Sequence, residues 1–100
     1  MLIKNIVLEE KKRNTEMIAA YEKALESLPK GNLSVKKVGN NKYYYLKYRN
    51  DKKIITDYIG KAAGKIKYIA EQIKRRKHYE AMLAELNKEN KVILKIIRGF

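Results

Sequence analysis

A chain of 100 residues is long enough for one domain with a small hydrophobic core. It contains no cysteine, which excludes disulfides and thiolate metal sites, and its apolar runs are far shorter than the roughly 20 residues that a membrane helix needs. The formal net charge is +13, and so large a positive surplus favours polyanionic partners such as nucleic acids over other ligands.

The first segment, residues 1–29, shows the helix period. Six apolar side chains recur on one face when spaced three and four apart: Ile3, Val7, Met17, Tyr21, Ala24 and Leu28. Glu10 and Asn14 interrupt this stripe, which leaves open one long helix or a break near residues 14–15. We favour a helix over residues 15–28 with a helical lead-in. Pro29 and Gly31 then end the segment.

The second segment, residues 30–60, shows the strand period and predicts an antiparallel β-meander. The expected strands cover residues 33–38, 43–49 and 53–59. The turns at residues 39–42 and 50–52 are rich in Gly, Asn and Asp, which tolerate the positive φ of tight hairpins. Connections this short predict neighbouring strands in the order 1-2-3.

Alternation along the middle strand assigns its side chains to two faces. Tyr44, Leu46 and Tyr48 form the better core face, together with Leu33 and Val35 of the first strand. Tyr43, Tyr45, Lys47 and Arg49 form the exposed face, with Ser34 and Lys36 beside them. The third strand is ambiguous, and we place Ile54, Thr56 and Tyr58 inward because the alternative set contains Asp57.

The third segment, residues 61–100, predicts one helix from Ala62 to Arg98, because it contains no proline. Ile66, Ile69 and Ile73 form a first stripe, expected to cover the sheet. A second stripe has the four-three spacing of a coiled-coil seam and pairs with the first segment or with a second copy of the chain, giving a homodimer. Its members are Tyr79, Leu83, Leu86, Asn90, Ile93 and Ile97. The sequence therefore predicts a single α+β domain of order α-β-β-β-α.

The positive charge is concentrated in the middle of the chain. Residues 30–77 contain fifteen Lys or Arg against three acids, a net charge of +12, while the flanks together carry +1. Cations neutralise phosphates, and tyrosines stack on bases. The candidate nucleic-acid-binding residues are Lys36, Lys37, Lys42, Tyr43, Tyr45, Lys47, Arg49, Lys52, Lys53, Lys65, Lys67, Lys74 and Arg75. A basic surface that only faces solvent would have the same composition. A DNA or RNA partner is therefore a hypothesis.

Catalytic chemistry has little support in this sequence. His78 is the one histidine, and a surface position explains it. The acids of the middle segment do not cluster as two-metal hydrolysis requires. We expect a cytoplasmic, non-catalytic protein with no metal and no cofactor.

The stretch from Leu28 to Lys61 carries a recurring pattern. It contains Pro-x-Gly-x-Leu from Pro29, a Tyr-Tyr-Tyr-Leu-x-Tyr-Arg strand from Tyr43 and Tyr-Ile-Gly-Lys from Tyr58. This pattern resembles a group of small uncharacterised proteins of Gram-positive bacteria and their mobile elements. The resemblance implies a phage or mobile-element origin, in a nucleic-acid or host-defence role.

A looser similarity links the tyrosine-rich, basic middle strand to the arm-site-binding domains of tyrosine-recombinase integrases. Those domains also have three strands followed by a helix, and they lay the sheet in the DNA major groove. The chain lacks the Gly-Phe-x-Thr segment that usually joins sheet and helix there. Two further hypotheses remain beside nucleic-acid binding: an inhibitor or accessory factor of a nucleic-acid-handling protein, and a helical dimerisation module.

Overall fold

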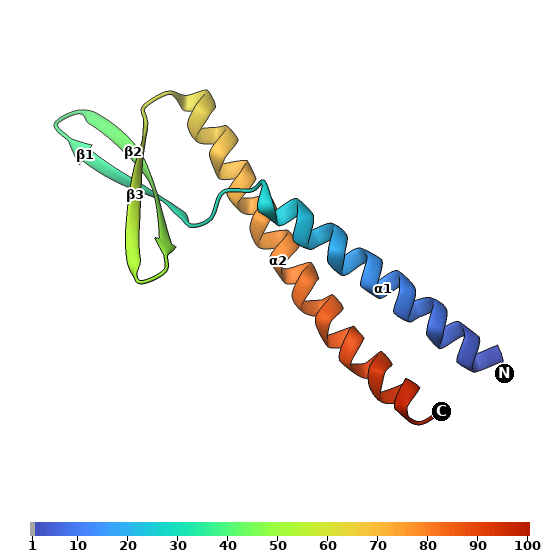
Figure 1. Ribbon diagram of the computed structural model, residues 1–100. Coiled ribbons are helices and arrows are strands. Elements are labelled where there is room, and N and C mark those ends of the chain that lie inside the picture. Colours follow the sequence, from blue (N-terminus) through green and yellow to red (C-terminus); the bar gives the residue numbers. More distant parts are fainter. Residues whose placement is uncertain (1) are drawn as a thin grey trace. The chain divides into compact units, whose positions relative to one another are not determined.

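The computed structural model describes residues 2–100 and has five elements, shown in Figure 1. In chain order these are α1 (Leu2–Glu26), β1 (Asn32–Val38), β2 (Asn41–Asn50), β3 (Lys53–Gly60) and α2 (Ala63–Arg98). The predicted α+β class and the order α-β-β-β-α are confirmed. The chain divides into two compact units, residues 1–27 with 78–100 (the helical unit) and residues 28–77 (the sheet unit).

The helical unit pairs α1 with the second half of α2 in antiparallel orientation. The Asn14 side-chain amide donates to the carbonyl oxygen of Leu86 over 2.8 Å. Further along, the rings of Tyr21 and Tyr79 meet edge-to-face with centroids 5.3 Å apart. The favoured bounds, residues 15–28, are wrong at both ends, because one uninterrupted helix runs from Leu2 to Glu26, without a break near residues 14–15.

The core of the helical unit is small and contains a polar side chain. Leu86 and Ile93 of the predicted seam are buried, and the other four seam residues are half-buried. Asn14, which interrupts the apolar stripe of α1, has no solvent exposure at all. The polar middle of α1 is therefore packed at this position rather than solvated.

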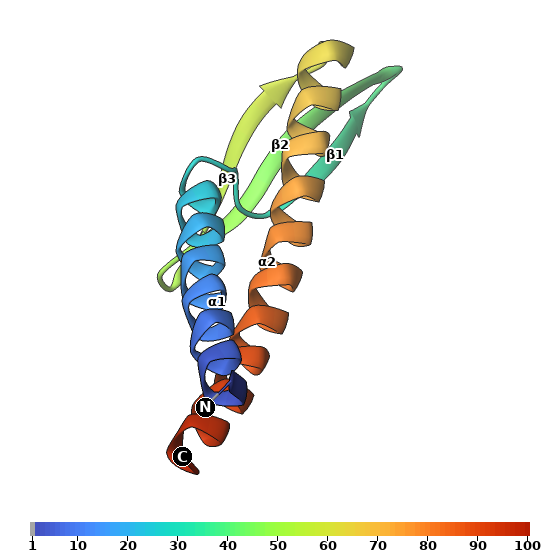
Figure 2. The ribbon, with the colours of Figure 1, turned by 90° about the vertical axis from the view of Figure 1, so that its right-hand side faces the viewer.

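The sheet unit contains an antiparallel sheet in the order β1-β2-β3, followed by the first half of α2 (Figure 2). Two-residue turns join the strands. Gly39 has a φ of 62° in the first turn, and Asp51 has a φ of 57° in the second, a conformation that Asp tolerates better than most residues. Turns of this length fix the register of the strands on either side.

The register defines an inner and an outer face of the sheet. Leu33 lies opposite Leu46 and Val35 opposite Tyr44, so the predicted inner set of β1 and β2 shares one face. The prediction for β3 is wrong. Tyr58 lies opposite Tyr45, and Ile54 opposite Arg49, so both belong to the outer face.

The direct cause of this error is the length of the second turn. Because the turn has only two residues, Asn50 pairs with Lys53. Each following side chain of β3 then lies on the same face of the sheet as its partner in β2. Asp57 then falls on the inner face, opposite Leu46. A bulge follows, because Tyr44 pairs with Gly60 while Tyr45 pairs with Tyr58.

The segment before β1 is fastened to both the sheet and α2. The Arg76 guanidinium donates to the Leu28 carbonyl over 2.8 Å, and the Lys77 ammonium donates to the Asn32 side chain over 3.0 Å. Gly31 has a φ of 96°, and a Cβ there would lie 2.0 Å from the Lys47 carbonyl oxygen. Only glycine fits this close approach.

Candidate nucleic-acid interface

The outer face of the sheet collects the most prominent predicted residues. Tyr43, Tyr45, Lys47 and Arg49 alternate along β2 on this face. The register sets Ser34 and Lys36 of β1 opposite Tyr45 and Tyr43. On the other side of β2, Tyr58, Thr56 and Ile54 of β3 lie opposite Tyr45, Lys47 and Arg49 in that order. Aromatic rings, long cations and hydroxyl groups therefore share one surface.

Three tyrosines form a cluster at the centre of the outer face. The Tyr58 ring centroid lies 5.4 Å from that of Tyr45 and 6.4 Å from that of Tyr43. Tyr58 is 59% exposed, while the other two rings are half-buried. The Lys61 ammonium lies 5.6 Å from the Tyr43 ring centroid, within the range of a cation–π contact. We call these three residues the tyrosine cluster.

A shallow hollow lies beside the tyrosine cluster. Its lining comes from all three strands: Ser34, Val35, Lys36, Tyr45, Lys47 and Thr56. Both lysines are exposed, so each can bring its ammonium group to a bound anion. The hollow offers one aromatic ring, two cations and three hydroxyl groups, which suits a phosphate next to a flat ring.

Four other predicted residues of the sheet lie elsewhere. Lys37 and Lys42 pair with each other on the inner face, near the first turn. Lys53 also falls on the inner face by its pairing with Asn50, and Lys52 lies in the second turn. The predicted set is therefore split, and five of its sheet residues share the outer face: Lys36, Tyr43, Tyr45, Lys47 and Arg49.

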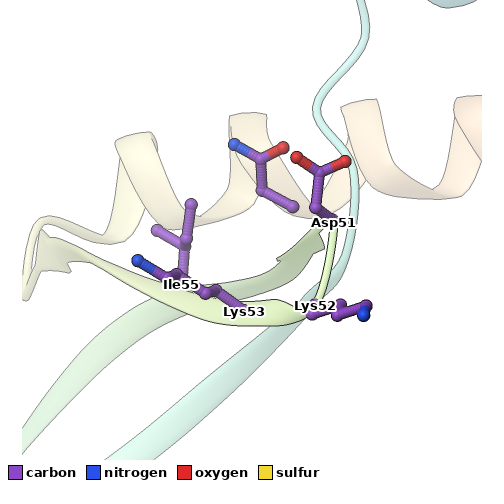
Figure 3. A pocket seen from close by; sticks show the side chains of 5 residues that line it. Asp51, Lys52, Lys53 and Ile55 are labelled. Atoms are coloured by element: carbon purple, nitrogen blue, oxygen red, sulfur yellow. The ribbon is translucent and has the colours of Figure 1, made fainter.

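The second turn forms a hollow of its own, shown in Figure 3. Asn50, Asp51, Lys52, Lys53 and Ile55 line it. Figure 3 shows the Lys52 side chain pointing away from the Asp51 carboxylate. One acid and two separated lysines do not form a recognisable ligand site. The two lysines add positive charge at the edge of the sheet.

The basic residues of α2 have two different roles. Lys65, Lys67, Lys74 and Arg75 are exposed along its first half. By contrast, Arg76 holds the segment before β1 through its hydrogen bond to Leu28, and Lys77 holds the first residue of β1 through its hydrogen bond to Asn32. Half of the basic cluster at residues 74–77 is therefore used inside the sheet unit.

The inner face carries one electrostatic feature. The Tyr48 hydroxyl donates a hydrogen bond to the Asp57 carboxylate, which raises the pKa of Tyr48 above 10.0. Desolvation and the negative charge of Asp57 act in the same direction. This hydrogen bond gives Asp57 a partner on the face that the sequence analysis reserved for apolar residues.

Sequence reasoning missed four members of the outer face: Ile54, Thr56 and Tyr58 of β3, and Lys61. Tyr58 was assigned inward, and Lys61 was not among the candidates, although it lies over Tyr43. A signal for Tyr58 was present, because a two-residue turn at Asp51 and Lys52 fixes the register of β3. No comparable signal exists for Lys61, since its position depends on the bulge before it.

Metal-binding clusters and membrane-spanning helices are both absent from residues 2–100. Residues 2–100 contain no group of three or more His, Cys, Asp or Glu side chains able to hold a metal ion. Within the same range, neither helix has a stretch long and apolar enough to cross a bilayer.

The chain matches a protein family. The family model described as a domain of unknown function, DUF6788, matches residues 7–68, which run from α1 through the whole sheet into α2. No curated protein and no solved structure matches the chain. Because the match covers more than half of its residues, the chain belongs to the DUF6788 family.

Proposed function

We propose that the protein is a small non-catalytic nucleic-acid-binding protein that contacts DNA or RNA with the outer face of its sheet. The observation that carries the proposal is the tyrosine cluster, which is flanked by Lys36, Lys47, Arg49 and Lys61 on one surface. The unit that holds this surface, residues 28–77, has a net charge of +12.

The chemistry of this surface suits both parts of a nucleotide. The ammonium and guanidinium groups neutralise backbone phosphates and release counterions, which supplies sequence-independent affinity. The exposed Tyr58 ring offers a flat surface on which a base can stack. A phage or mobile-element origin stays a prediction of the motif resemblance.

A second candidate is binding to a nucleic-acid-handling protein. Ile54 favours it, because this side chain is 67% exposed on the outer face beside the tyrosines. Aromatic rings, arginine and an apolar side chain are typical anchors of a protein interface. An acidic surface on such a partner would complement the same positive field.

Fluorescence anisotropy with labelled duplex DNA, single-stranded DNA and RNA at low salt tests the proposal. We expect binding to at least one of the three. Tyr58→Ala and Arg49→Ala should each weaken it by about 1–3 kcal/mol, the usual cost of losing a stacked base or a charged contact. Lys91→Ala is the matched control, because it removes an exposed cation from the helical unit.

The absence of binding to all three nucleic acids at low salt would contradict the proposal. Capture of a defined protein partner that survives nuclease treatment would then favour the second candidate. Equal losses for Lys91→Ala and Arg49→Ala would show that overall charge, rather than the outer face, determines binding.

A further inference from the structure

The end of the helical unit at which both chain ends lie exposes a group of large apolar side chains. Figures 1 and 2 show the two chain ends at the same end of the α1–α2 pair. The exposed residues are Leu2, Ile3, Ile6 and Leu8 from α1, with Val92, Ile96 and Phe100 from the C-terminal end. Their exposed fractions run from 43% for Leu8 to 75% for Leu2. We call this group the apolar end.

The register of the helical pair places the α1 residues and the C-terminal residues of the apolar end at the same position along the helix axes. Tyr21 meets Tyr79, and Asn14 meets Leu86 seven residues further along each helix. Continuing in the same antiparallel register sets residues 3–8 level with residues 92–97. Leu2 and Ile6 share one side of α1, and Val92 and Ile96 share one side of α2, each pair at the i, i+4 spacing. At one level these side chains can form a contiguous apolar patch, and such patches mark interaction sites.

The helical unit buries too little to be self-sufficient. Among the described residues of this unit, Leu86 and Ile93 are the buried hydrophobic side chains. A helical pair with two buried hydrophobic side chains is marginal by itself, and small units of this kind usually gain stability by associating with a partner.

We propose that the apolar end binds the apolar end of a second copy of this chain, forming a symmetric homodimer. A symmetric dimer needs a self-complementary patch, and side chains from both helices at one level can supply one. The charge distribution favours the same partner. The helical unit has a net charge of +1 against +12 for the sheet unit, so two copies meet with little repulsion through their helices.

This surface differs from the seam that the sequence suggested for dimerisation. The seam residues Leu86 and Ile93 are buried against α1 within one chain. Val92 and Ile96 flank that seam on the exposed side of α2, with 57% and 44% exposure. A partner on the apolar end would therefore leave the intrachain pair in place.

Sedimentation equilibrium or light scattering of nuclease-treated protein tests this proposal. We expect the wild-type chain to have twice its mass of 11.8 kDa at micromolar concentration. The double variant Val92→Lys with Ile96→Lys should raise the dimer dissociation constant by about 100-fold or more, because it puts two charges into an apolar contact. Val92 and Ile96 are exposed in the single chain, so both substitutions should leave the fold intact. Circular dichroism of the double variant checks this.

The control is Ile54→Lys, which changes an equally exposed isoleucine in the sheet unit. It should leave the mass unchanged. A monomeric wild-type chain, including one that binds lipid vesicles instead, would overturn the proposal. A double variant that remains dimeric would do the same. Both experiments omit nucleic acid, so their outcome is independent of the function proposed for the outer face.

Discussion

At the scale of single residues, Tyr48 shows how the inner face tolerates an acid. Its hydroxyl donates to Asp57 from the neighbouring strand. Ionisation of Tyr48 would place a second negative charge beside that carboxylate and remove the donated proton. The folded chain therefore holds the Tyr48 proton more tightly than the unfolded chain does.

This geometry predicts a pH dependence of stability. Because the folded pKa of Tyr48 is raised above 10.0, the stabilising contribution of its hydroxyl is fully present below that pH. It is lost as the pH rises through the raised folded value. Wild type should therefore be more stable than Tyr48→Phe at neutral pH, and the difference should shrink in strong alkali.

Urea unfolding of both proteins across a pH series measures the difference in free energy. Tyr68→Phe is the control, since Tyr68 is 62% exposed on α2. A Tyr48→Phe difference that is constant up to strong alkali would contradict the assigned hydrogen bond.

Asn14 shows where sequence reasoning fails at this scale. Its polarity at an apolar position suggested a break or a solvated stretch, yet the side chain is wholly buried. Its amide nitrogen bonds to the Leu86 carbonyl, while its own carbonyl oxygen has no hydrogen-bond partner within residues 2–100. A periodicity argument cannot foresee this, because the partner is a backbone atom 72 residues away.

At the scale of elements, local sequence patterns predict the secondary structure and the side-chain faces of β1 and β2. Alternation in β1 and β2 assigned Leu33 and the β2 residues to the faces that the register gives, because paired side chains point the same way. Val35, expected in the core, is instead 51% exposed. The same reasoning failed for β3. There, the acid Asp57 favours the wrong face, whereas the turn length, which is the stronger constraint on register, gives the right one.

Gly31 gives a sharp test at this scale. A Cβ at this position would lie 2.0 Å from the Lys47 carbonyl oxygen, and the φ of 96° is strained for any other residue. We expect Gly31→Ala to destabilise the protein by about 2 kcal/mol or more, as measured by urea unfolding.

Gly64→Ala is the matched control. Gly64 lies in the first turn of α2, with nothing within 4 Å of an added Cβ. That substitution should stabilise the protein by about 0.5–1 kcal/mol, because alanine favours the helix. Similar destabilisation by both substitutions would show that the close approach of Gly31 to β2 is not the cause.

At the scale of the whole molecule, the charge division seen in the sequence coincides with a structural division. The basic stretch was defined as residues 30–77, and the sheet unit covers residues 28–77. The candidate site was only partly predictable. Its β2 residues follow from strand alternation, whereas Tyr58 and Lys61 depend on the register of β3 and on the bulge near its end.

This concentration of charge predicts a strong salt dependence. If about five phosphates are neutralised, the logarithm of the affinity for duplex DNA should fall with the logarithm of salt at a slope of about −4 to −5. Lys47→Ala should reduce the slope by about one, since it removes one phosphate contact. Lys91→Ala should leave the slope unchanged, and a salt-independent affinity would contradict an electrostatic mode.

The order of the two units along the chain has an entropic consequence. The sheet unit is continuous, while the helical unit must join residues 1–27 to residues 78–100. Closing a flexible loop costs about 0.6 kcal/mol for each doubling of its length, so folding the intervening 50 residues first lowers that cost. A lesion confined to the sheet therefore also loosens the helices, by lengthening the tether that joins them.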